Sequence, residues 1–184
     1  MTVLAAAAGG HAFWITSRAA GIVALLASSA SVTAGLLMGG RIVKRGGIEL
    51  RATHEALSLA ALAALAVHAL ALLGDGYLNP SLADVTIPFA SSYQRFWIAA
   101  GIAGGWLMVV LGLSYYARAR IGVARWRTLH RFTVLAWILG IAHALGQGTD
   151  AGTAWFAIGL AAAVIPAAAL LAVRLAPPSP VGTS

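Results

Sequence analysis

The sequence predicts an all-α integral membrane protein, a bundle of about five transmembrane helices, with six as the alternative count. Of the 184 residues, 60% are hydrophobic and only 9% are charged, whereas soluble domains carry about 25% charged residues. The mean hydropathy is +0.87. The apolar residues also gather in stretches that each approach the ~20 residues needed to cross a bilayer. Membrane lipid is therefore the first expected partner.

Five apolar stretches account for the predicted helices. They cover about residues 17–39, 54–73, 96–116, 129–145 and 154–173. The first carries regularly spaced small residues, from Gly21 to Gly35, which favour close helix packing. The third contains GIAGG at 101–105, and its place inside a membrane helix indicates small-residue packing rather than a phosphate-binding loop. The fourth is the shortest, and we expect it to extend at both ends.

Basic residues predict the orientation. One stretch carries Arg41, Lys44, Arg45 and Arg51, a second carries Arg118, Arg120, Arg125, Arg127 and Arg131, and Arg174 closes the last helix. Only Arg18 and Arg95 lie at the other side, together with Asp75, Asp84 and Asp150. The positive-inside rule then places the N-terminus outside and the C-terminus in the cytoplasm of a multi-pass cell (inner) membrane protein. This topogenic role explains the net charge of +7, so nucleic acid is not an expected partner.

Three segments make up the predicted organisation. Residues 1–16 form an extracytoplasmic segment, residues 17–174 the transmembrane helical domain, and residues 175–184 a disordered cytoplasmic tail rich in proline. Residues 1–16 lack a basic start, so we expect the first helix to be retained rather than cleaved. The loop from Gly74 to Gln94 is the only sizeable non-helical segment. It is either an acceptor or partner surface or a simple connection.

Four of the five histidines fall as two matched pairs inside the apolar stretches. His54 and His68 are 14 residues apart, and His130 and His143 are 13 apart, so each pair spans ~20 Å of helix. Both helices run from the cytoplasmic to the outer side. His54 and His130 therefore share the cytoplasmic depth, and His68 and His143 share the outer depth. An isolated membrane histidine usually bonds a neighbouring helix or relays protons, but matched depths predict two bis-histidine haems.

The absence of cysteine limits the type of haem. No cysteine occurs in the chain, which excludes disulfides, cysteine-held iron–sulfur clusters and covalent c-type haem. The expected cofactor is therefore haem b, two per chain. Fourteen residues keep His54 and His68 on one helix face, but thirteen leave His143 roughly 140° from His130. We therefore predict a tilt or an irregularity near Gly140.

The chain resembles the ferric reductase-like transmembrane domain family, which includes the membrane parts of NADPH oxidases and ferric reductases and the haem subunit of methionine sulfoxide reductase systems. The resemblance spans about Trp14 to Arg174. It is carried by the two histidine spacings, by WITSRAAGIVALL, by LAVHALALLGDGY, and most strongly by WRTLHRFTVLAWILGIAHAL. It implies two stacked haems, with His54 and His130 on the cytoplasmic-side iron and His68 and His143 on the outer iron.

Two features depart from that family. Many members have six helices and a C-terminal flavin and nicotinamide domain, whereas this chain shows five helices and no dinucleotide fingerprint. The expected function is transmembrane electron transfer from a separate cytoplasmic flavoprotein reductase or a membrane quinol to an outer acceptor or partner enzyme. The chain would be an oxidoreductase or its electron-transfer subunit. The alternatives are a haem-bearing anchor subunit of a quinol-linked complex and a haem-free helical scaffold.

Other polar and aromatic residues have two open interpretations. Arg18 and Arg95 either snorkel to headgroups or pair with propionates of the outer haem, and Arg127 and Arg131 either set the topology or bind the inner propionates. His11 is expected to be interfacial. Trp106 and Trp137 lie deeper in their helices and pack either against porphyrin or, as we expect, in ordinary helix contacts. The aromatic belt contains Trp14, Trp97, Trp126 and Trp155.

Overall fold

Five long helices dominate the structure. The computed structural model describes residues 2–39 and 47–176, and side chains from residue 11 onward within those ranges. The described helices, in chain order, are α1 (Thr2–Gly39), α2 (Gly47–Leu73), α3 (Leu82–Thr86), α4 (Arg95–Leu113), α5 (Arg118–Ile121), α6 (Val123–His130), α7 (Thr133–Gln147) and α8 (Ala154–Leu175). No strand occurs in the described part of the chain. The all-α prediction is confirmed.

Five membrane spans are confirmed by length and hydropathy. They are His11–Gly39, Gly47–Leu73, Arg95–Leu113, Val123–Gln147 and Ala154–Leu175. The fourth span joins α6 and α7 and is longer at both ends than residues 129–145, as the sequence suggested. Large apolar side chains on these helices are exposed, including Leu70, Val110 and Ile158. Such a surface matches a lipid environment, so the chain is a multi-pass membrane protein.

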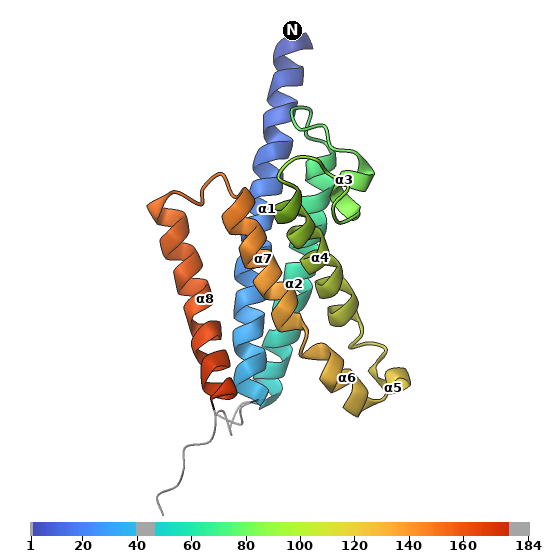
Figure 1. The fold of residues 1–184 in the computed structure, drawn as a ribbon, viewed down its shortest axis with the longest axis vertical. Helices are drawn as coiled ribbons and strands as arrows, with labels where there is room; N and C mark the ends of the chain where they lie inside the picture. Colours follow the sequence, from blue (N-terminus) through green and yellow to red (C-terminus); the bar gives the residue numbers. More distant parts are fainter. Residues whose placement is uncertain (1, 40–46, 177–184) are drawn as a thin grey trace, which may run out of the picture.

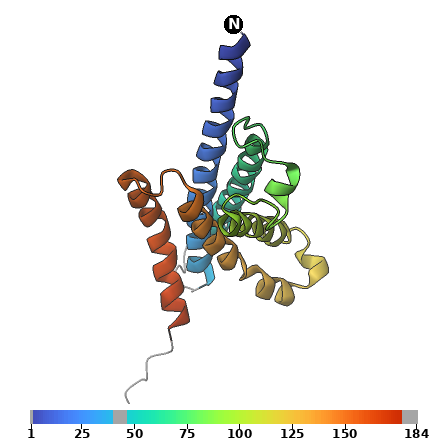
Figure 2. The same ribbon diagram turned by 45° about the horizontal axis from the view of Figure 1, so that its top comes forward.

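Helix α1 is the centre of the bundle (Figure 1). It packs along α2 and also contacts α7 and α8, while α4 packs mainly against α7. The view in Figure 2 separates α8 on one side of α1 from α4 and α2 on the other. Side chains buried along α1 are mostly small, among them Ala20, Ser28, Ser29 and Ala34. Small residues allow close backbone approach where helices cannot gain from burying apolar surface away from water.

Several boundaries differ from the predicted ones. Helix α1 begins at Thr2, so residues 2–16, predicted as a segment outside the first helix, continue it and project beyond the bundle (Figure 1). Helix α4 ends at Leu113 rather than near residue 116. The expected tail beyond residue 176 and the basic residues Arg41, Lys44 and Arg45 lie outside the described residues.

The loop from Gly74 to Gln94 is not wholly non-helical, which corrects the prediction. It contains the short helix α3, whose N-cap Ser81 accepts a hydrogen bond from the Asp84 backbone while the Asp84 carboxylate accepts one from the Ser81 backbone. This capping box stabilises a turn too short to hold itself by helix propensity. The Ser81 hydroxyl and backbone N–H both donate to Asp84, and they lower the pKa of that carboxyl.

Candidate functional site: two opposed histidine pairs

The structure brings the four histidines together as two pairs. The ring centres of His54 and His130 are 6.1 Å apart with planes at 84°. Those of His68 and His143 are 6.3 Å apart with planes at 76°. We call His68 with His143 the outer pair and His54 with His130 the inner pair, after the side expected for each. All four rings are half-buried. In each pair one ring comes from α2 and the other from the α6–α7 segment.

The spacing within each pair fits two axial ligands of one iron. An imidazole nitrogen binds a transition metal at ~2 Å and lies about 1 Å from its own ring centre, so two opposed ligands have ring centres about 6 Å apart. Both pairs match this separation. The described residues contain no cluster of three or more His, Cys, Asp or Glu side chains. A haem supplies the other four iron ligands itself, so two imidazoles complete its coordination.

Backbone carbonyl groups fix the orientation of three of the rings. Nδ1 of His54 lies 2.8 Å from the Ser31 carbonyl oxygen, and Nδ1 of His68 lies 2.8 Å from that of Ser17. Nδ1 of His143 lies 2.9 Å from the Trp97 carbonyl oxygen. A carbonyl only accepts, so each Nδ1 carries the proton and donates it. Nε2 then keeps its lone pair for a metal, the arrangement that supporting hydrogen bonds give to metal-binding histidines.

A glycine lies four residues after each of these carbonyls. In a helix the carbonyl of residue i lies against residue i+4, so a glycine there leaves the oxygen open to a second donor. A Cβ placed at Gly21 would lie 3.0 Å from His68 Nδ1, and one at Gly35 would lie 3.2 Å from His54 Cε1. A Cβ at Gly101 would lie 2.5 Å from His143 Nδ1. The glycines are therefore required by the rings that they face.

A 14-residue repeat on α1 matches the 14-residue spacing of the histidines on α2. The sequences are SRAAG at 17–21 and SVTAG at 31–35. The Ser17 hydroxyl donates to the His68 carbonyl at 3.1 Å, and the Ser31 hydroxyl approaches the His54 carbonyl at 3.4 Å. Each hydroxyl also lies 3.0–3.1 Å from Nδ1 of the same histidine. Sequence analysis missed this repeat, although both copies are visible in the chain.

His130 is held differently from the other three histidines. Its Nδ1 is buried and lies near the Leu111 backbone carbonyl, but it completes no hydrogen bond of normal geometry within the described residues. Its ring instead stacks on Trp126, with ring centres 4.9 Å apart and planes at 28°. The Trp126 indole is itself fixed, because Nε1 donates to the Ser114 hydroxyl at 3.1 Å. The fourth histidine is thus positioned by an aromatic contact, with a weaker approach to the Leu111 carbonyl in place of a full hydrogen bond.

The predicted irregularity lies at a different place from the expected one. Helix α7 runs unbroken through Gly140, so the expected kink there is wrong. The break falls at Arg131 and Phe132, directly after His130, where Phe132 bonds to Leu129 and Leu135 bonds to Phe132 in i→i+3 fashion. Such turns rotate each residue by about 20° more than an α-helix does. Together with the divergence of α6 from α7 in Figure 1, the turn brings both rings to one side.

Arg18 and Arg95 both bond to other residues of the chain. Arg18 forms a two-pronged ion pair with Asp150, its Nε lying 2.5 Å from Oδ2, and its guanidinium lies over Trp14. This pair ties α1 to the loop before α8, and sequence analysis did not foresee it. Arg95 donates to the Phe89 carbonyl at 3.1 Å. Arg127 and Arg131 are exposed. The predicted propionate contacts of all four arginines stay predictions.

The central tryptophan, Trp137, and two glycines of α4, Gly104 and Gly105, pack as ordinary helix contacts. Trp137 is 3% exposed, and its Nε1 donates to the Ser29 hydroxyl at 2.9 Å. It lies between the two histidines of its own segment in sequence. Trp106 is exposed and donates to the Thr86 carbonyl. A Cβ at Gly104 would lie 3.0 Å from the Ala136 carbonyl of α7, so the GIAGG segment acts in helix packing, as predicted.

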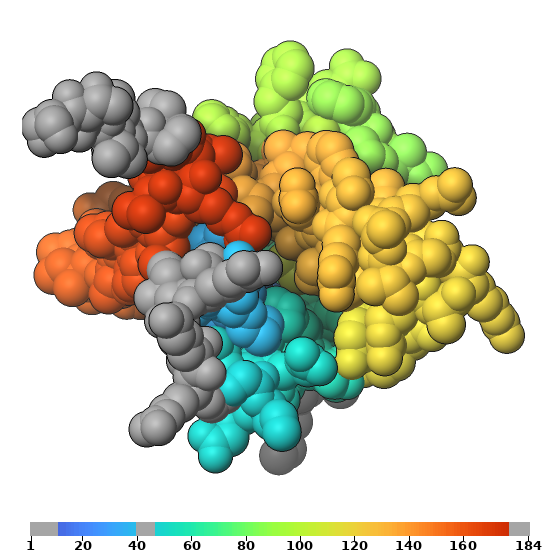
Figure 3. Space-filling model, turned by 90° about the horizontal axis from the view of Figure 1, so that it is seen from below, coloured from blue at the N-terminus to red at the C-terminus, as the bar shows by residue number. Residues whose placement is uncertain are grey.

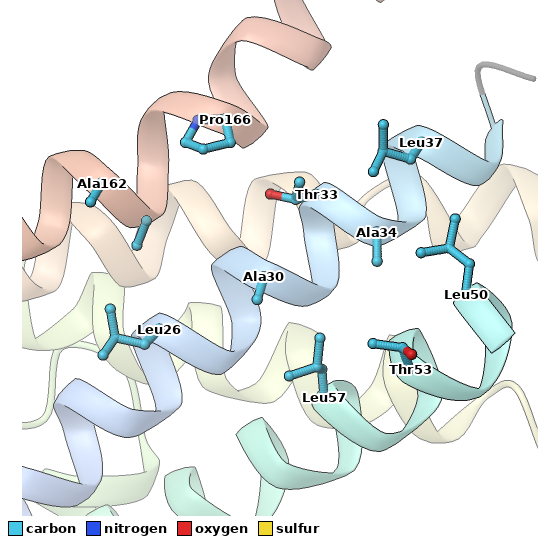
Figure 4. Close-up of a pocket in the computed structure, with 11 residues that line it drawn as sticks. Leu26, Ala30, Thr33, Ala34, Leu37, Leu50, Thr53, Leu57, Ala162 and Pro166 are labelled. Carbon is cyan, nitrogen blue, oxygen red and sulfur yellow. The ribbon is translucent and has the colours of Figure 1, made fainter. Parts of the chain in front are cut away.

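A groove of about 350 Å³ lies between α1, α2 and α8 (Figure 4). Its lining is almost entirely aliphatic, and its polar side chains are Thr33 and Thr53. Both hydroxyls donate to their own helix, to Ser29 and Glu49 respectively. No polar group of the lining is therefore left to orient a polar ligand. The groove suits a lipid acyl chain and is not the candidate site.

Two further polar side chains, His11 and Asp75, lie outside the histidine pairs. His11 is exposed on α1, as an interfacial residue would be. Asp75 is 2% exposed and one of its carboxylate oxygens makes no hydrogen bond within the described residues, while the other accepts from the Tyr77 backbone.

Comparison of the chain with protein-family models, curated proteins and solved structures finds no match.

Proposed function

We propose that this chain transfers electrons across a membrane through two b haems, each held by one histidine pair. The observation that carries the proposal is the pair geometry. Two pairs of imidazole rings, ~20 Å apart along the helices, each have the separation of two axial ligands of one iron. In three of the four rings the Nδ1 hydrogen bond leaves Nε2 free. A hydrogen bond between helices, the ordinary role of a membrane histidine, would not need this arrangement twice.

Bound haem supplies a reversible one-electron change between ferric and ferrous iron. The chain's residues supply the rest. His54 and His130 would hold the inner haem, and His68 and His143 the outer haem. Two protein ligands leave no open position on the iron, which favours electron transfer over oxygen binding. The carbonyls of Ser17, Ser31 and Trp97 keep the imidazoles in the tautomer that binds metal.

The charge distribution indicates the direction of electron transfer and the sides on which the donor and the acceptor lie. Arg118, Arg120, Arg125, Arg127 and Arg131 occupy one end of the bundle, and Asp75, Asp84 and Asp150 lie toward the other. By the positive-inside rule the inner pair faces the cytoplasm of a cell membrane. The donor is then a cytoplasmic flavoprotein or a membrane quinol, and the acceptor lies outside, as in the ferric reductase-like family that the sequence resembles.

Proteoliposomes test this function directly. The haem-loaded protein is placed in vesicles that contain ferricyanide, and dithionite is added outside. We expect the trapped ferricyanide to be reduced by wild-type protein and far more slowly by His68→Ala. Equal rates with wild-type protein and with protein-free vesicles would contradict transmembrane transfer. Wild-type transfer without any other subunit would also argue against a role solely as an anchor within a larger complex.

A further inference from the structure

The surface formed by α5, α6 and the adjoining turn is strongly basic. Between residues 118 and 131 the chain has five arginines and no acidic residue. Four of these side chains are exposed: Arg120, Arg125, Arg127 and Arg131. Figure 3 views the molecule from this end, and the α5–α6 segment forms a broad yellow part of the face, on the side away from α8. We call these four residues the arginine face.

A continuous series of ring contacts leads from this surface to the inner pair. The Arg118 guanidinium lies 3.9 Å from the centre of the Tyr115 ring and donates to the Tyr115 carbonyl at 2.7 Å. The Tyr115 and Trp126 ring centres are 5.8 Å apart, and Trp126 stacks on His130 at 4.9 Å. Tyr115 and Trp126 are half-buried. An aromatic path therefore joins the surface to a predicted haem ligand.

The path is held in place by further contacts. Trp126 Nε1 donates to the Ser114 hydroxyl, which donates in turn to the Leu111 carbonyl at 2.6 Å. The neighbouring Tyr116 hydroxyl donates to Glu55 of α2 at 3.0 Å. This carboxylate acceptor raises the pKa of Tyr116. The turn after α4 is thereby fixed to α2, the helix that carries the other inner histidine.

We propose that the arginine face is the docking site of an acidic, soluble electron-transfer protein, with the Tyr115 and Trp126 rings lying between the docked protein and His130. The proposal rests on the proposed function and adds the surface and the residues. Charge complementarity identifies the partner's chemistry, because an uninterrupted basic face attracts an anionic one and speeds encounter. Anionic lipid headgroups would also bind arginine, but a lipid role explains neither the series of ring contacts nor its end on a predicted haem ligand.

Binding measurements in neutral-lipid nanodiscs test the docking site. Haem-loaded protein in phosphatidylcholine nanodiscs is titrated with a flavodoxin, an acidic FMN protein, at low and high salt. We expect Arg120→Glu with Arg125→Glu to weaken binding at least tenfold at low salt. The loss should shrink at 0.5 M salt because screening acts over ~3–10 Å. The control is Arg174→Glu in the last turn of α8, which changes the charge by two units where the double variant changes it by four.

The outcomes separate this inference from the proposed function. Unchanged flavodoxin affinity in the double variant, with two haems bound, would overturn docking while leaving the haems intact. An equal loss of affinity in Arg174→Glu would also overturn docking, because it would show that binding depends on the net charge of the protein and not on the arginine face. If the double variant instead loses only affinity for phosphatidylglycerol vesicles, the arginines serve lipid and the inference is wrong. Tyr115→Leu should keep the flavodoxin affinity but slow haem reduction by flavodoxin, whereas Tyr115→Phe should restore the rate.

Discussion

The outer and inner histidine pairs differ in how their rings are held. In the outer pair both Nδ1 atoms bond to carbonyls, on α1 and α4, and glycines face both rings. In the inner pair only His54 has this support. Leu111 and Tyr115 lie 14 residues after Trp97 and Gly101 on the α4 side. Tyr115 thus takes the place of a glycine, and the Trp126 ring stacks on His130 where the Leu111 carbonyl lies near Nδ1 without completing a normal hydrogen bond.

The difference arises because α1 holds a histidine at both sites, whereas α4 holds one at the outer site only. Helix α1 repeats one five-residue motif at both depths, so it positions both histidines of α2 in the same manner. The α4 segment supports the outer site only, because the helix ends at Leu113 and the chain then turns into α5. The inner site is therefore the more adjustable of the two, and it lies beside the arginine face.

Loss of a ligand gives the largest expected effect. We predict that His143→Ala removes the outer haem and keeps the inner one, while His130→Ala does the reverse. Each variant should bind about half the wild-type haem, since the altered site loses one of the two protein bonds that would hold its iron. Haem counted per chain by the pyridine haemochrome method checks the prediction. Loss of both haems from each folded variant would contradict two independent sites.

The second largest effect is expected when a side chain replaces Gly101 at the outer site. Gly101→Val places side-chain atoms where the His143 ring lies, since even a Cβ would come within 2.5 Å of Nδ1. Overpacking costs typically 1–3 kcal/mol, so we expect the outer haem to be lost or to become high-spin. Gly105→Ala is the matched control, because its Cβ would make ordinary 3.6 Å contact with Leu65. Electron paramagnetic resonance distinguishes the two spin states.

Trp126→Leu should loosen the inner site alone. Without the stacked indole, the His130 ring keeps only its weak approach to the Leu111 carbonyl among the described residues. We expect one of the two ferrous haems to bind carbon monoxide, which the wild-type protein should not do. Trp126→Phe should behave more like wild type. Carbon monoxide difference spectra report the change, and binding at the outer haem instead would reverse the assignment of the two sites.

The serine variants should give the smallest effect and an equal one at both depths. Ser17→Ala and Ser31→Ala each remove a hydroxyl that bonds the helix α2 backbone beside a histidine. A neutral hydrogen bond contributes about 1 kcal/mol, and the carbonyl bond to Nδ1 remains. We expect both haems to be retained, with a small shift in one midpoint potential per variant. Redox titration measures it, and a shift of both potentials by either variant would be inconsistent with separate supports.

Sequence reasoning succeeded where the signal is long and regular. Five apolar stretches gave five spans, and the depth argument brought His54 near His130 and His68 near His143. It failed where a short local contact decides the geometry. The helix break at Arg131 and Phe132 contains no glycine or proline that would have predicted it. Gly140, where an irregularity was predicted, lies within a continuous helix. The SxxAG repeat is visible in the sequence. Its role in holding His54 and His68 could not be inferred without knowing that α1 packs antiparallel to α2.

Absorption spectroscopy of the purified protein tests the central claim most directly. Protein expressed with added haem is purified in mild detergent, and spectra are recorded in the oxidised and dithionite-reduced states, with haem counted per chain. The account predicts two low-spin b haems per chain. A folded but colourless protein would contradict it, because the paired imidazoles would then serve helix packing alone.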